Sequence, residues 1–284
     1  MKLVRFGEIN KELPGVLMED GSVIDVSSCI PDFNRECLET GGLERLRAWL
    51  PEYKDLVPRI PESVRLGSPI ADPSKIICVG LNFLDHCKEL NDPIPNEPVL
   101  FTKAVSALSG PFDPIENPRG ASHLDWEVEL AFIVGKEAKN IAEENALEYV
   151  AGYALMNDLS ERFFQKHRDG QWVKGKSHDT FAPLGPYIAT PEELPDVYNL
   201  SMVTKVNGEI LQNGNTSSMI FKVPFLLSYI SQFMTLKPGD IISTGTPPGV
   251  GAGKKPPRYL QPGDQIEQTI PGLGTQRHTV IACL

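Results

Sequence analysis

Hydrophobic and acidic side chains alternate along residues 123–134 of the chain. The acidic positions are Asp125, Glu127 and Glu129, and apolar side chains follow each of them. A period of two is typical of a β-strand with one apolar and one polar face. Neighbouring side chains on one face lie roughly 7 Å apart, so Glu127 and Glu129 could reach one hard cation. An ordinary solvated strand face shows the same pattern, and alternation alone does not decide between the two.

Short apolar runs separated by glycine and proline continue over most of the chain. They predict an α+β protein that is mostly β, with a domain of mixed topology over residues 71–284. A proline-rich loop precedes that domain, so residues 1–70 are expected to form a small N-terminal domain that contains β-strands. In this part the pattern predicts strands at 2–6, 15–18 and 23–26 and a helix at 43–50.

Local signals predict four elements of the larger domain. Asn207-Gly208 separates two strand-like runs and is the strongest hairpin signal in the chain. Residues 223–233 have the spacing of a helix, and residues 141–149 that of an amphipathic helix. Apolar residues 150–156 predict a strand.

A histidine and a glutamate lie three residues apart in a short helix predicted at residues 83–90. Helical spacing places His86 and Glu89 side by side, so the carboxylate can orient the imidazole and raise its basicity. This arrangement is common for a general base. A surface helix with a chance acid–base pair is the alternative. Because a glycine precedes this helix and a proline-rich loop follows it, the segment could also be a mobile lid.

Asp158 follows the apolar strand predicted at residues 150–156. An acidic side chain where a buried strand ends is well placed to line a cavity. Residues 159–165 could form a short helix, so Asp158 could instead be the N-cap of that helix.

Residues 170–177 satisfy the spacing G-x-x-x-x-G-K-S of phosphate-binding P-loops. Such a loop must follow a buried strand and open a helix, whereas polar residues precede this one and a proline-containing segment follows it. We therefore reject a nucleotide-binding P-loop. Lys176 remains a candidate for contacting an anion, although a solvated loop lysine is the commoner case. Residues 245–251 form a loop rich in glycine and proline, which could grip a carboxylate or be a rigid turn.

Composition narrows the range of partners. The 284 residues are 41% hydrophobic and 23% charged, which is typical of a globular protein. The formal net charge of −10 argues against a nucleic-acid partner or an anionic membrane. The sequence shows neither a membrane span nor a signal peptide, so we expect a cytoplasmic protein that acts on a small molecule. The five cysteines show no paired spacing, which suggests neither disulfides nor a zinc site.

Several stretches together strongly resemble the fumarylacetoacetate hydrolase family, and the resemblance covers essentially all of residues 75–284. It implies a rolled mixed β-sheet, and it also implies a homodimer or higher homo-oligomer. The matching stretches are residues 79–89, 125–130, 157–165, 175–186 and 243–251.

The resemblance also implies roles for the acidic residues and the histidine. Glu127, Glu129 and Asp158 match three oxygen ligands of Mg²⁺ or Mn²⁺, and hard-ligand chemistry favours these ions over zinc. His86 with Glu89 matches the base that activates water, on a segment that closes over the substrate.

Further matches concern the substrate, a small keto acid. Lys176 matches a group that contacts the substrate and the developing oxyanion. The family's Ser-Ala-Arg step reads Ser-Glu-Arg here, with Glu161 in place of alanine. The other residues expected to bind substrate are Arg162, Gln165, Lys103, Gly245 and Thr246.

The activity implied by the resemblance is hydrolysis of a carbon–carbon bond in a 2,4-diketo acid of the acylpyruvate type. Similarity to bacterial sugar-acid members favours 2,4-diketo-3-deoxy-L-rhamnonate or the L-fuconate isomer, cleaved to pyruvate and lactate. Oxaloacetate decarboxylation or tautomerisation is the nearest alternative, because it needs the cation but no attacking water. A catalytically silent binding module is a further alternative.

Overall fold

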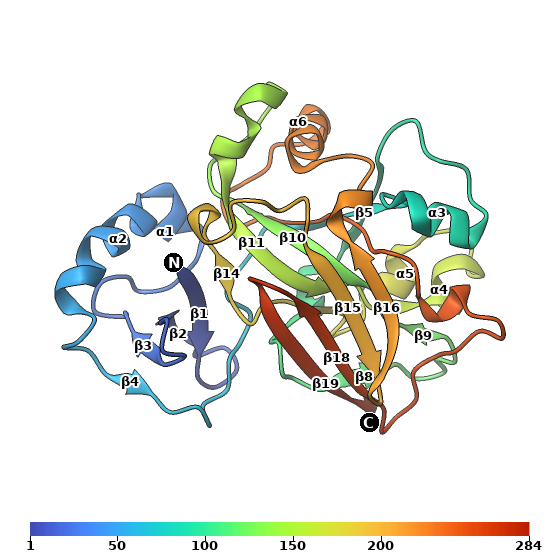
Figure 1. The fold of residues 1–284 in the computed structure, drawn as a ribbon, viewed down its shortest axis with the longest axis horizontal. Helices are drawn as coiled ribbons and strands as arrows, with labels where there is room; N and C mark the ends of the chain where they lie inside the picture. The colour runs from blue at the N-terminus through green and yellow to red at the C-terminus, as the bar shows by residue number, and fades with distance from the viewer. Residues whose placement is uncertain (284) are drawn as a thin grey trace.

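A ten-stranded sheet forms the main body of the computed structural model, which describes residues 1–283 (Figure 1). Strands β10 and β11 at its centre are antiparallel, with Val128 opposite Asn157. Strand β17 pairs antiparallel with β10 and parallel with β5. Across the sheet the order is β4 (Arg59–Ile60), β3 (Val23–Asp25), β2 (Leu13–Leu17), β1 (Lys2–Phe6), β14 (Ile188–Ala189), β11 (Val150–Asn157), β10 (Val128–Val134), β17 (Ile241–Ser243), β5 (Ile76–Gly80) and β6 (Val99–Lys103).

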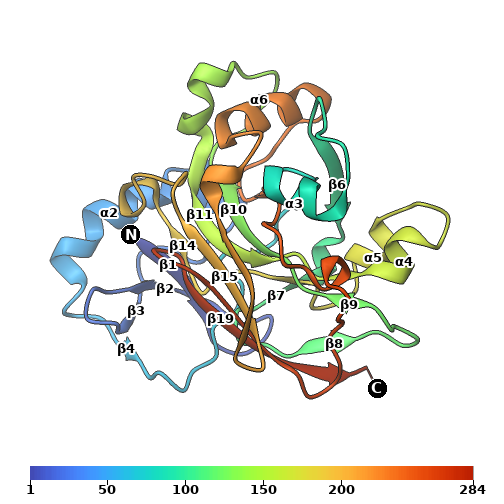
Figure 2. The same ribbon diagram turned by 45° about the vertical axis from the view of Figure 1, so that its right-hand side comes forward.

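A five-stranded sheet lies against the main sheet (Figures 1 and 2). Its hairpin turns at Asn207 and Gly208, which both have a positive φ, as a two-residue hairpin loop of type I′ requires. The predicted hairpin is therefore confirmed. The strand order is β16 (Glu209–Asn215), β15 (Ser201–Val206), β18 (Gln265–Ile270), β19 (Gly274–Ala282) and β8 (Ile115–Asn117). Two small sheets pair β9 (Leu124–Asp125) with β12 (Ser160–Glu161), and β7 (Leu108–Ser109) with β13 (Ala182–Pro183).

Helices are few and short, so the prediction of a mostly β protein is confirmed. The helix predicted at 223–233 is present with those bounds. The α-helix predicted at 141–149 is wrong: residues Glu143–Tyr149 form 3₁₀ turns in which Ala146 alone is buried, which leaves too narrow an apolar face to pack an α-helix. The α-helices are α1 (Arg35–Glu39), α2 (Gly42–Tyr53), α3 (Leu84–Leu90), α4 (Arg162–Lys166), α5 (Val173–Lys176) and α6 (Val223–Phe233).

The N-terminal strands extend the main sheet. Strand β1 pairs antiparallel with β14, with Lys2 opposite Ala189, so residues far apart in the sequence share one ladder. The main sheet therefore continues across the domain boundary predicted at residue 70. That boundary remains a prediction. No helix within residues 1–283 is both long and apolar enough to span a membrane.

Strand β10 is buried on both faces. Its even-numbered side chains pack in one apolar cluster with α6, and Ala131 and Ile133 belong to a second cluster on the opposite face. Because side chains alternate along a strand, Glu129 shares the face of Ala131 and Ile133. One acidic side chain of the alternating stretch is therefore fixed inside the molecule by its apolar neighbours on β10.

The single strand predicted over residues 123–134 is wrong at its centre. Trp126 and Glu127 separate β9 from β10, because β9 pairs with β12 while β10 pairs with β11. At this break the N–H of Glu127 donates to the side chain of Asn157, 3.2 Å away, in place of a ladder carbonyl. The interruption directs the Glu127 side chain toward the end of β11.

Candidate active site

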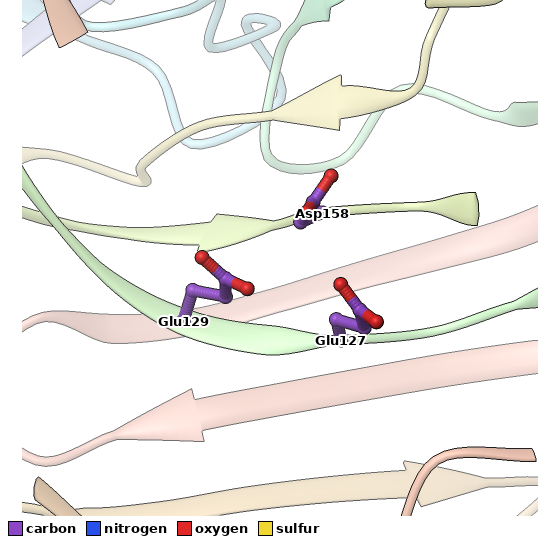
Figure 3. A group of neighbouring side chains, drawn as sticks. All are labelled: Glu127, Glu129 and Asp158. Atoms are coloured by element: carbon purple, nitrogen blue, oxygen red, sulfur yellow. The ribbon is translucent and has the colours of Figure 1, made fainter. Parts of the chain in front are cut away.

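Three carboxylates converge where β10 and β11 meet (Figure 3). Glu127 and Glu129 come from the β10 segment and Asp158 directly follows β11, and oxygen atoms of all three lie within 4.8 Å of one another. All three side chains are buried. The alternative of a solvated strand face is therefore wrong for this stretch.

Cationic side chains surround two of these carboxylates. The Nζ atom of Lys176 lies 2.7 Å from Glu127 Oε2 and 2.6 Å from Asp158 Oδ2. Arg162 Nη2 donates to Glu127 Oε1 at 2.6 Å, and Lys103 Nζ donates to Asp158 Oδ1 at 2.5 Å. Burial alone raises the pKa of Glu127, but the charges of Arg162 and Lys176 outweigh it and hold that pKa well below its usual value. The ionised form of Glu127 is therefore favoured.

Glu129 receives only neutral hydrogen bonds among the contacts described for it. Its Oε2 atom accepts from Ser243 Oγ at 2.5 Å and from the N–H of Gly245 at 2.9 Å. Burial, followed by the charges of Asp158 and Glu127, raises the pKa of Glu129 well above its usual value. A buried carboxylate in this situation is stabilised by a nearby cation, which favours its ionised form.

The donor set fits a hard divalent cation. All three groups are carboxylates, the oxygen ligands that Mg²⁺ and Mn²⁺ prefer, and no sulfur or imidazole lies among them. With the adjacent Asp125, four buried carboxyl groups face three cationic side chains, so one negative charge has no cationic side chain to balance it when all four are ionised. Glu127, Glu129 and Asp158 are therefore the residues that would hold the ion.

The predicted histidine–glutamate pair forms on α3. His86 Nδ1 lies 3.0 Å from Glu89 Oε2, and the other oxygen of Glu89 accepts from the N–H of Gly249 at 2.9 Å. His86 is buried and lines the same cavity as the three carboxylates. The carboxylate on Nδ1 leaves Nε2 to act on a molecule in the cavity.

The cavity has a volume of about 80 Å³, and most of the residues predicted for substrate binding line it. Arg162 also contacts Gln165, from its Nη1 to the side-chain oxygen at 3.2 Å. The hydroxyl of Thr246 is engaged within the protein, because it donates to a carbonyl of β10 and accepts from Gln212. The predicted residues that line the cavity are Arg162, Gln165, Lys176, Gly245 and Thr246.

Lys103 lies elsewhere. It is buried behind Asp158, where its ammonium donates to that carboxylate and to the carbonyl of Leu159 at 3.0 Å, and it is not among the residues that line the cavity. The structure thus places Lys103 where it supports Asp158.

Asp158 is not a helix cap. The helix after it, α4, begins later than predicted, at Arg162, and its N-cap is Glu161, whose carboxylate accepts from the N–H of Phe164 at 2.6 Å. The N-cap alternative for Asp158 is therefore wrong. Glu161 also accepts from the N–H groups of Ser122 and His123, which explains an acidic residue next to Arg162.

Sequence reasoning missed an aromatic wall of the cavity. The rings of Phe101 and Trp172 meet edge to face with centroids 5.2 Å apart, and Lys176 Nζ lies 4.8 Å from the centre of the Phe101 ring. Trp172 also packs on Gly80, where an added Cβ would lie 3.0 Å from the indole. The signal in the sequence that could have indicated this wall is local, because Trp172 precedes the candidate residue Lys176 by four positions.

Comparisons with known proteins agree with this geometry. A family model described as fumarylacetoacetate (FAA) hydrolase, C-terminal, matches residues 75–281. A 2,4-didehydro-3-deoxy-L-rhamnonate hydrolase from Sphingomonas sp. (strain SKA58) is 46% identical over 281 residues, which cover 99% of this chain and 96% of that relative.

Solved structures extend the likeness to the whole fold. A fumarylacetoacetate hydrolase from Exiguobacterium antarcticum is 40% identical, with a TM-score of 0.85 and full coverage of both chains. A maleylpyruvate hydrolase from Sphingobium sp. SYK-6, solved with a manganese(II) ion and pyruvate, is 31% identical, with a TM-score of 0.83 and full coverage of both chains. The family model and these relatives confirm the resemblance seen in the sequence, and the chain belongs to the fumarylacetoacetate hydrolase family.

Proposed function

We propose that this protein hydrolyses a carbon–carbon bond of a 2,4-diketo acid, and that 2,4-diketo-3-deoxy-L-rhamnonate or its L-fuconate isomer is the substrate. One observation carries the proposal: the buried triad of Glu127, Glu129 and Asp158 lines the same cavity as His86 with its partner Glu89. The name of the Sphingomonas relative supports the sugar acid, and the pyruvate complex of the Sphingobium enzyme supports an acylpyruvate.

A Mg²⁺ or Mn²⁺ ion held by the triad would supply Lewis acidity to the 2-keto acid end of the substrate. The protein's own residues perform the other tasks. His86 Nε2 takes a proton from water, while Glu89 keeps Nδ1 as the hydrogen-bond donor and stabilises the imidazolium that forms. Water attacks the 4-ketone, so a carbon–oxygen bond forms at C4. As this bond forms, the carbonyl π pair moves to the C4 oxygen. The oxyanion then re-forms its C=O bond while the C3–C4 bond breaks, which leaves a carboxylic acid at C4 and places the released electron pair in the enolate of pyruvate. The enolate carbon takes the proton held by His86, so pyruvate and the neutral imidazole result.

Two residues are placed to meet the charge that develops on the substrate. The ammonium of Lys176 lines the cavity beside the triad. The side-chain oxygen of Gln165 accepts from Arg162, which leaves the amide nitrogen as the donor to substrate. Fixed donors of this kind stabilise an oxyanion because they need no reorganisation as charge appears.

The experiment follows the loss of diketone absorbance and the release of pyruvate, with protein stripped of metal and then given Mg²⁺ or Mn²⁺. We expect cleavage that requires the ion and falls at least about 100-fold in Glu127→Gln and in His86→Gln. His167→Gln, a change to an exposed histidine, is the control and should keep full activity. Folded, metal-loaded protein that cleaves no diketone overturns the proposal. Oxaloacetate turnover that survives His86→Gln would favour decarboxylation or tautomerisation instead.

A further inference from the structure

We infer that Asp125 and Trp126 are positioning residues for the general base, through the loop at residues 249–252. They hold this loop so that one of its N–H groups fixes Glu89, which in turn orients His86. The inference rests on the proposed role of His86. In Figure 2 the orange-red segment that contains this loop lies near α3 and β9.

Asp125 is fully buried and accepts four hydrogen bonds, three of them from backbone N–H groups. Its Oδ1 atom accepts from the N–H groups of Trp126 at 2.8 Å and Gly251 at 2.6 Å. Its Oδ2 atom accepts from the N–H of Ala252 at 3.0 Å and from Arg162 Nε at 2.8 Å. Two consecutive N–H groups of the loop are thus bound to one carboxylate that has no remaining freedom to turn.

Trp126 binds the same loop at its other end. Its indole N–H donates to the carbonyl of Gly249 at 3.2 Å, and its ring is fully buried. The φ of Gly249 is 109°, and a Cβ at this position would lie 2.1 Å from the carbonyl oxygen of Leu211. Only glycine fits this backbone, and in this conformation the N–H of Gly249 faces Glu89 on α3.

Glu89 is held at both carboxylate oxygens. One accepts from the N–H of Gly249 at 2.9 Å and the other lies 3.0 Å from His86 Nδ1. Gly253 packs against the same side chain, since a Cβ there would lie 2.7 Å from Glu89 Cδ. With both oxygens bound, the carboxylate plane cannot rotate, and the imidazole is oriented with it.

Asp125 and Trp126 also connect the base to the candidate cation site. Arg162 donates from Nε to Asp125 and from Nη2 to Glu127, at 2.8 and 2.6 Å. Asp125, Trp126 and Glu127 are adjacent in the chain, so the two residues that hold the loop and the first carboxylate of the triad belong to one backbone segment. This continuity sets the distance between the base and the cation site, which a hydrolytic step needs to be constant.

The test is a double-mutant cycle with Trp126→Phe and Glu89→Gln, using metal-loaded protein and the best diketone substrate. Phenylalanine keeps an aromatic ring but removes the N–H that binds Gly249. We expect Trp126→Phe to lower kcat about 10-fold in the wild-type background, with KM and metal affinity changed less than about twofold. In the Glu89→Gln background the same change should cost less than about twofold, because its path to His86 is already broken. Trp49→Phe, at a half-buried tryptophan on α2, is the matched control.

Equal losses in both backgrounds, or no loss in either, overturn the inference. Should Trp126→Phe fold poorly, Asp125→Asn provides a second variant, whose loss of kcat should likewise be smaller in the Glu89→Gln background. Amide hydrogen exchange of α3 gives a readout that needs no substrate: it should be faster in Trp126→Phe and unchanged in Trp49→Phe. If the wild type cleaves no diketone, the proposed function fails. Unchanged exchange of α3 in Trp126→Phe instead overturns the inference that Trp126 holds Glu89 through the loop.

Discussion

Replacing Lys176 by methionine should destabilise the metal-free protein and make it more responsive to a divalent cation. The ammonium is almost completely buried and lies 2.7 and 2.6 Å from oxygens of Glu127 and Asp158. Removing one partner of a buried ion pair leaves uncompensated charge, which costs roughly 3–5 kcal/mol. At about 2 °C per kcal/mol for a chain of this size, Tm should fall by roughly 6–10 °C.

A divalent cation should reverse part of this loss, because it neutralises the carboxylates that the lysine served. For wild-type protein, a cation at 100 times its Kd adds about 2.7 kcal/mol of stability, or roughly 5 °C in Tm. The rise should be larger in Lys176→Met, because no ammonium then repels the ion. Activity should remain low even at saturating metal, since the ammonium that we propose to stabilise the substrate's developing charge is missing.

Thermal unfolding with a chelator and with Mn²⁺ measures both effects. Lys174→Met is the matched control: it removes the same charge from the same helix, α5, but at an exposed position whose ammonium contacts only a carbonyl, that of Arg168, among its described contacts. Surface changes of this kind usually stay within about 0.5 kcal/mol. The reasoning is refuted if Lys176→Met unfolds at the wild-type temperature in chelator, or if Mn²⁺ raises its Tm less than that of the wild type.

Three further predictions concern the cation, the substrate and the fold. Burial, followed by neighbouring carboxylates, raises the pKa of Glu129, and the cation needs its ionised form, so metal affinity should increase with pH. Calorimetry in two buffers of different ionisation enthalpy should show proton release on binding, and a pH-independent affinity contradicts this. Trp172→Ala should raise kcat/KM for acylpyruvates with bulky acyl groups about 10-fold relative to acetylpyruvate, because it shortens the aromatic wall of the cavity. Val173→Ala, on the exposed side of α5, is the control and should not change this ratio. The same substrate profile in both variants would show that the wall does not select the acyl group. Glu161→Gln should lower the free energy of unfolding in urea by about 1–3 kcal/mol, because its carboxylate accepts three N–H groups, and an unchanged midpoint excludes that role.

Elements with strong local signals could be predicted from the sequence. The hairpin at Asn207-Gly208 depends on two residues that accept a positive φ, and α6 depends on apolar spacing within 11 residues. The pairing of β1 with β14 joins Lys2 to Ala189 and has no local signal, because either strand could meet several edges of similar pattern. Such pairings are decided by packing of the whole chain.

In the candidate site, too, contacts between residues close in the sequence could be predicted, and contacts between distant segments could not. The short spacing of His86 and Glu89 on one helix predicted their contact, and the structure forms it. The contacts of Asp125 with Gly251 and Ala252 join segments far apart in the sequence, and alternation alone could not indicate that this carboxylate faces a loop. Family resemblance supplied the triad, and its burial became visible only in the structure.

The acidic stretch illustrates why period-two spacing was an incomplete guide to its chemistry. Asp125, Glu127 and Glu129 occupy positions that one regular strand would place on a single face, as if all three were to share one cation. In the structure Arg162 lies between the first two and binds both, at 2.8 and 2.6 Å, so Asp125 is neutralised by a side chain and committed to the loop. Glu127 and Glu129 then meet Asp158 in a group of carboxylates that could hold a metal ion. Three similar carboxylates thus acquire different tasks from their partners, and the break at Trp126 is what separates those partners.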